Sequence, residues 1–336
     1  MARPNKEFLM AWSSLSGASI EAGWQAIAIP SAGPLKLRAG RRSPGNAEAV
    51  LVGIPYAKLA AAEKLPEGQG FTVERADLEG NGNLWLALTR KPAGSTELFA
   101  AMACDVVGAL DDAVVAGADE AKLVRVFLGR VGAWQEFMRK GTQALSPEAE
   151  IGLIGELTLL RVIIDAGMPA AAAIDSWVGP LDGIQDFEIG FGVLEVKATL
   201  AAQGFPAKIA SLEQLDDSLR QPLFLAGARL HQMETGQNLV NFVDAVRHLV
   251  KGDAEAARLL SDRLIAAGFI DAHIERYPRR FVVAEVRVIE VSGSFPRLTT
   301  GTVPLGIMRA MYEIDLDKAL GDDVGVVIAL RKLGAI

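Results

Sequence analysis

Acidic side chains and a lysine gather between positions 186 and 197, where the sequence is DFEIGFGVLEVK. The pattern predicts a β-hairpin whose turn is supplied by Gly190 and Gly192. Alternate side chains of a strand share a face, so Asp186 lies with Glu188 and Glu195 lies with Lys197. If the two polar faces coincide, three carboxylates and one ammonium group meet on one surface. The carboxylates then repel one another unless a divalent cation or the lysine offsets their charge.

Such a cluster has a clear chemical use. Carboxylate oxygens suit Mg²⁺ or Mn²⁺, which keep bound waters and also bind phosphate. A lysine beside the ion can position a water and neutralise negative charge that develops on phosphorus oxygens. The alternative is an amphipathic strand that carries an ordinary solvated Glu/Lys pair.

A fourth acid stands on a predicted helix from about Pro147 to Ala166, with Ser146 as its N-cap. Glu156 lies in the middle of this helix, and apolar residues cover nearly all of its faces. A buried, unpaired carboxylate either becomes neutral or finds a cation. Alternatively, Glu156 emerges at a gap in the packing and meets water.

The elements that must position these residues follow a definite order. After the helix we expect strands at 174–178, 186–189 and 193–199, a helix at 211–219 and a strand at 222–230, which is an α-β-β-β-α-β order. Five short strands are expected before residue 90, followed by a helical stretch at 96–143. Beyond the core we expect helices at 239–250 and 254–267, a strand at 281–291 and a tail of a helix and then a strand. The fold class is therefore α/β (α+β), with a β-rich region and helical connection at 1–145, a core at 146–235 and a C-terminal α/β region packed on it at 236–336.

This arrangement resembles the PD-(D/E)XK nuclease superfamily, in which an acid on a helix precedes an Asp and a Glu-x-Lys triplet. Gln185 stands where that pattern has proline. Six shorter segments are also similar to an uncharacterised bacterial family of PD-(D/E)XK motif proteins, whose members tend to be encoded among restriction and phage-defence genes. These segments are Gly155–Leu157, Trp177–Pro180, Asp186–Phe187, Glu195–Thr199, Ile209–Leu215 and Phe295–Leu298.

The resemblance implies roles for individual residues. Asp186, Glu195 and the backbone carbonyl of Val196 would bind Mg²⁺ or Mn²⁺, and Glu156 would bind through a metal water or a second ion. Lys197 would orient the attacking water. Gln214 matches a polar position that supports the lysine in many members, or it is a helix-surface glutamine. Two further hydroxyls, of Thr199 and Ser211, could reach a DNA phosphate or serve the strand and the helix cap.

Composition and the absence of known motifs exclude several classes of protein and of site. The only cysteine is Cys104, so an intramolecular disulfide or a cysteine-based zinc site is excluded, and a small buried side chain is the expected role. We expect a cytoplasmic protein, because neither a secretory leader nor a membrane-length apolar run is found. No phosphate-binding loop, dinucleotide fingerprint or nucleophile elbow occurs, and the three histidines lack metal-ligand spacing. The net charge of −7 disfavours general binding to polyanions, although basic residues cluster at 36–42 and 276–297.

The expected function is Mg²⁺-dependent hydrolysis of DNA phosphodiesters within a bacterial restriction or phage-defence system, with DNA and other defence proteins as partners. One alternative is a nuclease-fold subunit that binds DNA or proteins without cutting. Another is an interaction protein whose acidic hairpin pairs with basic side chains of a partner.

Overall fold

The computed structural model describes residues 6–15, 22–60, 63–78, 82–141 and 143–336. The chain forms two compact units, Met1–Thr142 and Gln143–Ile336, which are described separately. Among the described residues, no helix combines the length and the apolar character needed to cross a membrane.

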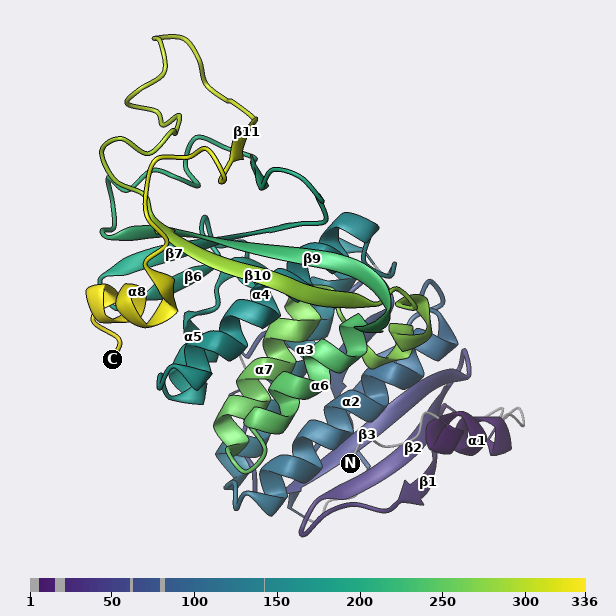
Figure 1. Cartoon of the computed structure of the whole chain (residues 1–336). Helices are drawn as coiled ribbons and strands as arrows, with labels where there is room; N and C mark the ends of the chain where they lie inside the picture. Colours follow the sequence, from purple (N-terminus) through teal and green to yellow (C-terminus); the bar gives the residue numbers. More distant parts are fainter. Residues whose placement is uncertain (1–5, 16–21, 61–62, 79–81, 142) are drawn as a thin grey trace. The chain divides into compact units, whose positions relative to one another are not determined.

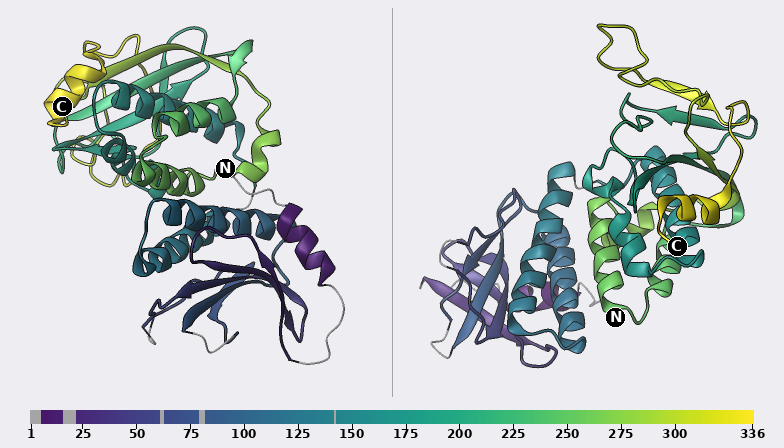
Figure 2. Two further views of the ribbon diagram at one scale, coloured as in Figure 1. Left: turned by 90° about the horizontal axis from the view of Figure 1, so that it is seen from below. Right: turned by 90° about the vertical axis from the view of Figure 1, so that its left-hand side faces the viewer.

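The first unit is built on a five-stranded antiparallel sheet with the order β1-β2-β3-β5-β4. The strands are β1 (Gly23–Ile29), β2 (Lys36–Ser43), β3 (Ala47–Pro55), β4 (Phe71–Arg75) and β5 (Asn83–Arg90). The helices are α1 (Lys6–Ser14), α2 (Thr96–Val115) and α3 (Glu120–Lys140). Helices α2 and α3 cover one face of the sheet (Figure 2). The five strands predicted from the sequence are confirmed, whereas α1 was not predicted.

The helical stretch predicted at 96–143 is interrupted. Gly117 has a φ of 76°, a left-handed conformation that ends α2, and Asp119 caps α3 by accepting a hydrogen bond from the amide of Lys122. The side chain of Ser95 caps α2 in the same way. Local capping chemistry therefore divides one expected helical region into two antiparallel helices.

The second unit contains a mixed sheet with the order β10-β9-β7-β6. Its strands are β6 (Phe187–Ile189), β7 (Gly192–Thr199), β9 (Leu223–Gln237) and β10 (Phe281–Glu290). Strand β9 is parallel to β7, and the other pairs are antiparallel. A separate antiparallel pair joins β8 (Pro206–Ile209) to β11 (Tyr312–Asp315). The structure is thus of the α+β class that the sequence predicts.

Helices and the small sheet lie on opposite faces of the mixed sheet (Figure 1). The helices are α4 (Pro147–Asp165), α5 (Ala170–Ser176), α6 (Leu239–Leu249), α7 (Ala254–Ala266) and α8 (Gly325–Leu333), with 3₁₀ turns η1 (Gly179–Leu181) and η2 (Asp271–Arg276). One core joins Leu157 of α4 to Leu194 and Val196 of β7. The other joins Val193 of β7 to Phe205 and Ile314 beside the small sheet. Strand β7 is therefore covered on both faces, which fixes its position.

Three expectations for this unit are wrong, and one strand is missing from them. Residues 174–176 end helix α5 instead of starting a strand, because four alanines at 170–173 favour a helix and only Trp177 pairs with a strand residue, Phe187. Residues 211–219 form turns instead of a helix, because Ser211 and Asp216 bond to nearby backbone amides. Strand β8 was not predicted. In the tail, β11 precedes α8 instead of following it.

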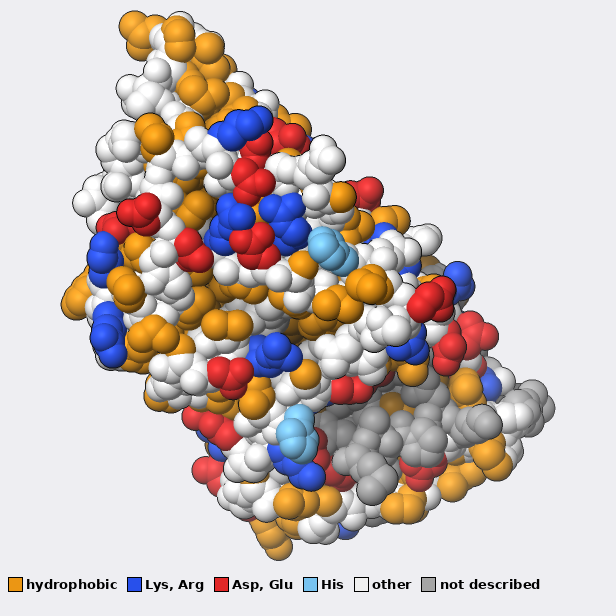
Figure 3. Space-filling model, viewed as in Figure 1, with side chains coloured by type: hydrophobic (Ala, Val, Ile, Leu, Met, Phe, Trp, Pro, Cys, Tyr) orange, Lys and Arg blue, Asp and Glu red, His pale blue; other side chains and the backbone are white. Residues whose placement is uncertain are grey.

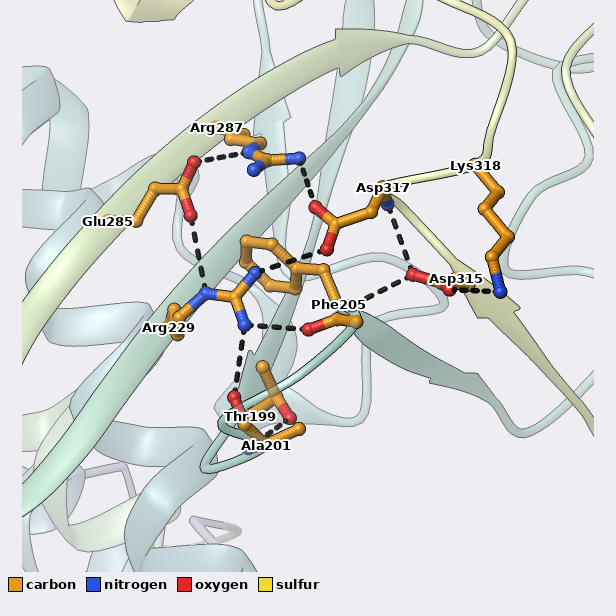
Figure 4. A network of polar contacts seen from close by, with 10 residues as sticks. Thr199, Ala201, Phe205, Arg229, Glu285, Arg287, Asp315, Asp317 and Lys318 are labelled. Atoms are coloured by element: carbon orange, nitrogen blue, oxygen red, sulfur yellow. Dashed lines mark hydrogen bonds and ion pairs between the residues drawn. The ribbon is translucent and has the colours of Figure 1, made fainter.

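An arginine network holds the chain that leaves β7 (Figure 4). Arg229 of β9 donates hydrogen bonds to the carbonyls of Ala201 (3.0 Å) and Gly204 (2.6 Å), and its guanidinium lies 4.5 Å from the centre of the Phe205 ring. Arg287 of β10 lies 5.2 Å from the same ring and forms an ion pair of 2.7 Å with Asp317. The network therefore fixes the end of β7 and the start of β8 to the main sheet.

Candidate active site

Helix α4 approaches strand β7 at a glycine. A Cβ atom on Gly155 would lie 2.9 Å from the Cβ of Ala198, which is closer than such contacts normally are. Only glycine lets the helix backbone pass this close to the strand. The next residue along the helix is Glu156, so this contact brings its carboxylate toward β7.

The contact makes a paired prediction about two glycines of one helix. Gly155→Ala should destabilise the second unit by about 1–3 kcal/mol through overpacking. Gly152→Ala should be neutral or stabilising by up to about 1 kcal/mol, because no atom lies within 4 Å of the added methyl group. Urea unfolding followed by circular dichroism measures both variants. Equal stability of the two would show that α4 does not need this close approach.

Glu156 is half-buried, and its carboxylate is held by a tryptophan. The indole N–H of Trp177 donates a hydrogen bond of 2.7 Å to Oε2 of Glu156. Burial and the nearby negative charge of Asp186 raise the pKa of Glu156 well above its ordinary value, against the opposing effect of the Trp177 hydrogen bond. Glu156 thus lies close enough to Asp186 to interact with it electrostatically.

Asp186 immediately precedes β6 and is fixed through both its backbone and its side chain. Its carbonyl accepts hydrogen bonds from the amides of Val178 (2.9 Å) and Gly179 (3.0 Å), and its Oδ2 accepts one from the amide of Val196 (2.7 Å). Burial raises the pKa of the carboxyl, while the Val196 amide and Lys197 lower it. Asp186 is therefore anchored directly beside the strand that carries Glu195 and Lys197.

The predicted hairpin of β6 and β7 is confirmed, except that Gly192 is the first residue of β7 and not part of the turn. Ile189 pairs with Gly192, which leaves a two-residue turn of Gly190 and Phe191 in which Gly190 has a φ of 53°. Glu188 shares the predicted face but not the cluster, because its exposed side chain forms an ion pair of 3.0 Å with Arg220.

Glu195 and Lys197 lie on the same face of β7 and form an ion pair of 2.6 Å. Glu195 is only 1% exposed, and Nε2 of Gln214 donates a hydrogen bond of 2.8 Å to the same oxygen, Oε1. Burial and the negative charge of Asp186 raise the pKa of Glu195 to about 8, against the opposing effect of Lys197. The structure therefore brings Asp186, Glu195 and Lys197 together.

Gln214 lies in the turn region 211–219. Its Oε1 accepts a hydrogen bond of 2.7 Å from the amide of Ala210, which orients the side-chain amide so that Nε2 faces Glu195. It contacts the partner of Lys197, whereas the resemblance implied support of the lysine itself. The other two polar candidates make local bonds: Thr199 accepts from the amide of Ala201 and Ser211 from the amide of Glu213.

The donor atoms fit a hard divalent cation. Oε2 of Glu195 is buried and, within the described part of the chain, has no hydrogen-bond partner. The N–H and C=O of one strand residue point the same way, so the Val196 carbonyl faces the side on which Asp186 binds the Val196 amide. Oxygen donors of this kind are those that Mg²⁺ and Mn²⁺ prefer. Over residues 6–15, 22–60, 63–78, 82–141 and 143–336, no group of three or more His, Cys, Asp or Glu side chains could hold a metal ion. A backbone carbonyl and waters would have to complete the ligand set.

Sequence reasoning missed what Trp177 does. The segment Trp177–Pro180 was noted only as part of a family pattern, with no role assigned. The signal was present in the residue type, because a buried tryptophan needs a partner for its indole N–H and a buried glutamate needs a donor. The positions of the acids along the sequence do not show which of them accepts the hydrogen bond from the Trp177 indole.

Comparison with known proteins assigns the chain to a family. Residues 8–317 match the model of a protein family described as "Putative PD-(D/E)XK family member, (DUF4420)". Searches of the curated proteins and of the solved structures gave no match. The family match covers most of the chain, which therefore belongs to this PD-(D/E)XK-type family.

Proposed function

We propose that the protein is a deoxyribonuclease that hydrolyses DNA phosphodiester bonds with the help of Mg²⁺ or Mn²⁺. Asp186, Glu195 and the Val196 carbonyl would hold the ion, and Glu156 would bind it through a water or hold a second ion. The observation that carries the proposal is the buried Oε2 of Glu195, which has no partner among the described residues although it lies in a cluster of acids. Membership of a PD-(D/E)XK-type family supports the same reading.

The residues of the site would have different roles in the reaction. A bound divalent cation would lower the pKa of a water and stabilise negative charge on the scissile phosphate. The ammonium group of Lys197, 2.6 Å from Glu195, would orient the attacking water and neutralise developing charge. Gln214 would keep the Glu195 carboxylate in place through its hydrogen bond of 2.8 Å.

The cellular setting belongs to the same proposal. The resemblance to proteins encoded among restriction and phage-defence genes supports a role in such a system, in the cytoplasm, with DNA and other defence proteins as partners.

A second candidate is a nuclease-fold subunit that binds DNA or proteins without cutting, and the distribution of charge favours it. Residues 143–336 contain 18 Lys and Arg against 26 Asp and Glu, and residues 1–142 contain 16 against 15. On the face drawn in Figure 3, the blue and red side chains are interspersed. Several arginines of the basic clusters bind within the chain: Arg41 to Glu48, Arg42 to Glu74, Arg279 to Glu150, Arg287 to Asp317 and Arg297 to Asp217. They therefore offer less charge to DNA than the sequence implies.

Metal binding and cleavage test the proposal together. Wild-type protein should bind Mn²⁺ and nick plasmid DNA, whereas Asp186→Ala and Glu195→Ala should bind Mn²⁺ about 100-fold or more weakly, since each removes a direct ligand. Isothermal titration calorimetry measures binding, and agarose gels measure cleavage. Glu188→Ala is the matched control, because it removes an acid of the same hairpin that pairs with Arg220 instead of facing the cluster.

Each outcome favours one candidate. If Asp186→Ala and Glu195→Ala lose both Mn²⁺ binding and DNA cleavage while Glu188→Ala keeps them, the nuclease is supported. Mn²⁺ binding without cutting, even when the products of neighbouring genes are added, favours the subunit that does not cut. Absence of Mn²⁺ binding in the wild type favours an interaction protein whose acidic hairpin pairs with basic side chains of a partner.

A further inference from the structure

The segment Trp177–Gly179 leads from the end of helix α5 into the turn η1, and its first residue is buried against the hairpin. Trp177 is fully buried, its ring stacks on Phe187 at a centroid distance of 6.5 Å and an interplanar angle of 19°, and its backbone forms a bridge to the same residue. Phe187 directly follows Asp186. The Trp177 ring therefore packs on β6, directly beside Asp186.

This segment contacts two acids that are 30 positions apart. The Trp177 indole donates to the Glu156 carboxylate at 2.7 Å, and the amides of Val178 and Gly179 donate to the Asp186 carbonyl at 2.9 and 3.0 Å. A Cβ on Gly179 would lie 2.7 Å from Oδ1 of Asp186, so the absence of a side chain there leaves room for that carboxylate. One short stretch of chain therefore sets the positions of both Glu156 and Asp186.

A buried arginine fixes the segment from the other side. Arg263 of α7 is 9% exposed, and it donates hydrogen bonds from Nε to the Trp177 carbonyl (2.7 Å) and from NH2 to the Asp175 carbonyl (3.0 Å). Its ion pair with the Asp175 carboxylate is long, at 3.4 Å, and Asp175 is exposed, so backbone carbonyls provide most of its partners. Burying a guanidinium is unfavourable unless hydrogen bonds compensate for it. Here those bonds hold the backbone of the segment that carries Trp177.

We infer that Trp177 is a positioning residue of the candidate metal site: its indole N–H orients Glu156 while the backbone of the same segment, braced by Arg263, orients Asp186. The inference rests on the proposed function and extends it to residues that touch neither metal nor DNA. Groups that orient metal ligands typically change metal affinity by 10- to 100-fold when they are removed.

The chain contains a matched control for this role. In the first unit, the indole N–H of buried Trp134 donates to Oδ2 of Asp105, also at 2.7 Å. Trp177→Phe and Trp134→Phe each remove one indole N–H from a carboxylate and keep an aromatic ring. Both should lower the thermal midpoint, because each removes one hydrogen bond from a carboxylate. Asp105 keeps its hydrogen bond of 2.6 Å from Nε of Arg130. Only Trp177→Phe should weaken Mn²⁺ binding, by roughly 10- to 100-fold in calorimetric titration.

Gly179→Ala is a second variant, for the case in which Trp177→Phe does not fold. The atoms nearest to the added methyl group are Oδ1 of Asp186 at 2.7 Å and the Cα of the same residue at 3.3 Å, so the change displaces Asp186 itself. This variant should also bind Mn²⁺ more weakly than the wild type.

Three results decide the matter. Weaker Mn²⁺ binding in Trp177→Phe or Gly179→Ala, with normal binding in Trp134→Phe, supports the positioning role. Wild-type affinity in the folded Trp177 and Gly179 variants overturns it and leaves the proposed nuclease intact. A wild-type protein that binds no Mn²⁺ refutes the proposed function, and with it the role assigned to Trp177.

Discussion

Lys197→Met is expected to reduce DNA cleavage by about 10²–10³-fold while Mn²⁺ binding is retained. The lysine side chain is 17% exposed, and its Nζ lies 2.6 Å from Oε1 of Glu195. The ammonium group is therefore held beside the acids and can still face a substrate phosphate. Its removal takes away charge that stabilises the transition state but takes away no metal ligand. Cleavage rates on plasmid DNA, measured beside calorimetric Mn²⁺ binding, separate these two effects.

Lys208→Met is the control for this experiment. Lys208 is an exposed lysine of β8 in the same unit. The exchange removes the same charge from a side chain that, unlike Lys197, does not affect the pKa of Asp186 or Glu195. Its cleavage rate should stay close to that of the wild type. Full plasmid cleavage by Lys197→Met would count heavily against the role assigned to the lysine. Equal loss in both variants would mean that general attraction of DNA, and not chemistry at the site, was measured.

The parts of the site that the sequence predicted correctly are those fixed by local rules. The hairpin follows from alternation of side chains and from glycines that permit a two-residue turn, and these rules alone place Glu195 and Lys197 on one face. Helix α4 follows from Ser146 as N-cap, Pro147 at its first position and a continuous apolar pattern. These features depend only on residues that are close together in the sequence, so they can be predicted from the sequence alone.

What the sequence did not reveal depends on contacts between distant residues. Strand β8 forms because it pairs with β11, which begins more than 100 positions later, and neither strand is long enough to be recognised alone. Residues 211–219 have a helical composition, but side-chain bonds to backbone amides fold them into turns. That region nevertheless presents Gln214 to Glu195, although its element was assigned wrongly.

The same distinction applies to the acids. The positions of Glu156 on a helix and Asp186 on a hairpin predict that the two acids can lie close together. They do not predict which residues form hydrogen bonds with these acids. Trp177 donates such a hydrogen bond to Glu156, and Arg263, 86 positions away, binds the Trp177 carbonyl. Trp177 lies in a stretch that was expected to be a strand.

Glu195→Gln is expected to remove most of a pH dependence of stability that the metal-free wild type should show. The pKa of Glu195 is raised in the folded protein from 4.5 to about 8, because the group is buried beside the charge of Asp186. A raised pKa of a carboxyl means that its contribution to stability is fully present below about pH 4.5 and is lost as pH rises through about 8. Between these values the loss amounts to about 1.4 kcal/mol for each pH unit. Glutamine keeps the shape of the side chain but cannot ionise, so it escapes this loss.

The measurement is the free energy of urea unfolding in a chelator at several values from pH 5 to pH 9, for the wild type and for Glu195→Gln. The difference between the two proteins should move steadily in favour of the variant as pH rises, by a few kcal/mol in total. Comparing differences cancels the groups that titrate equally in both proteins. Glu156 is not among them, because the charge of Glu195 helps to raise its pKa and is absent from the variant. Saturating Mn²⁺ should flatten the wild-type slope, since a cation beside the carboxylate favours its ionised form. A difference that stays constant over this range would mean that Glu195 ionises at its ordinary pKa, and hence that Lys197 and Gln214 outweigh burial at this position.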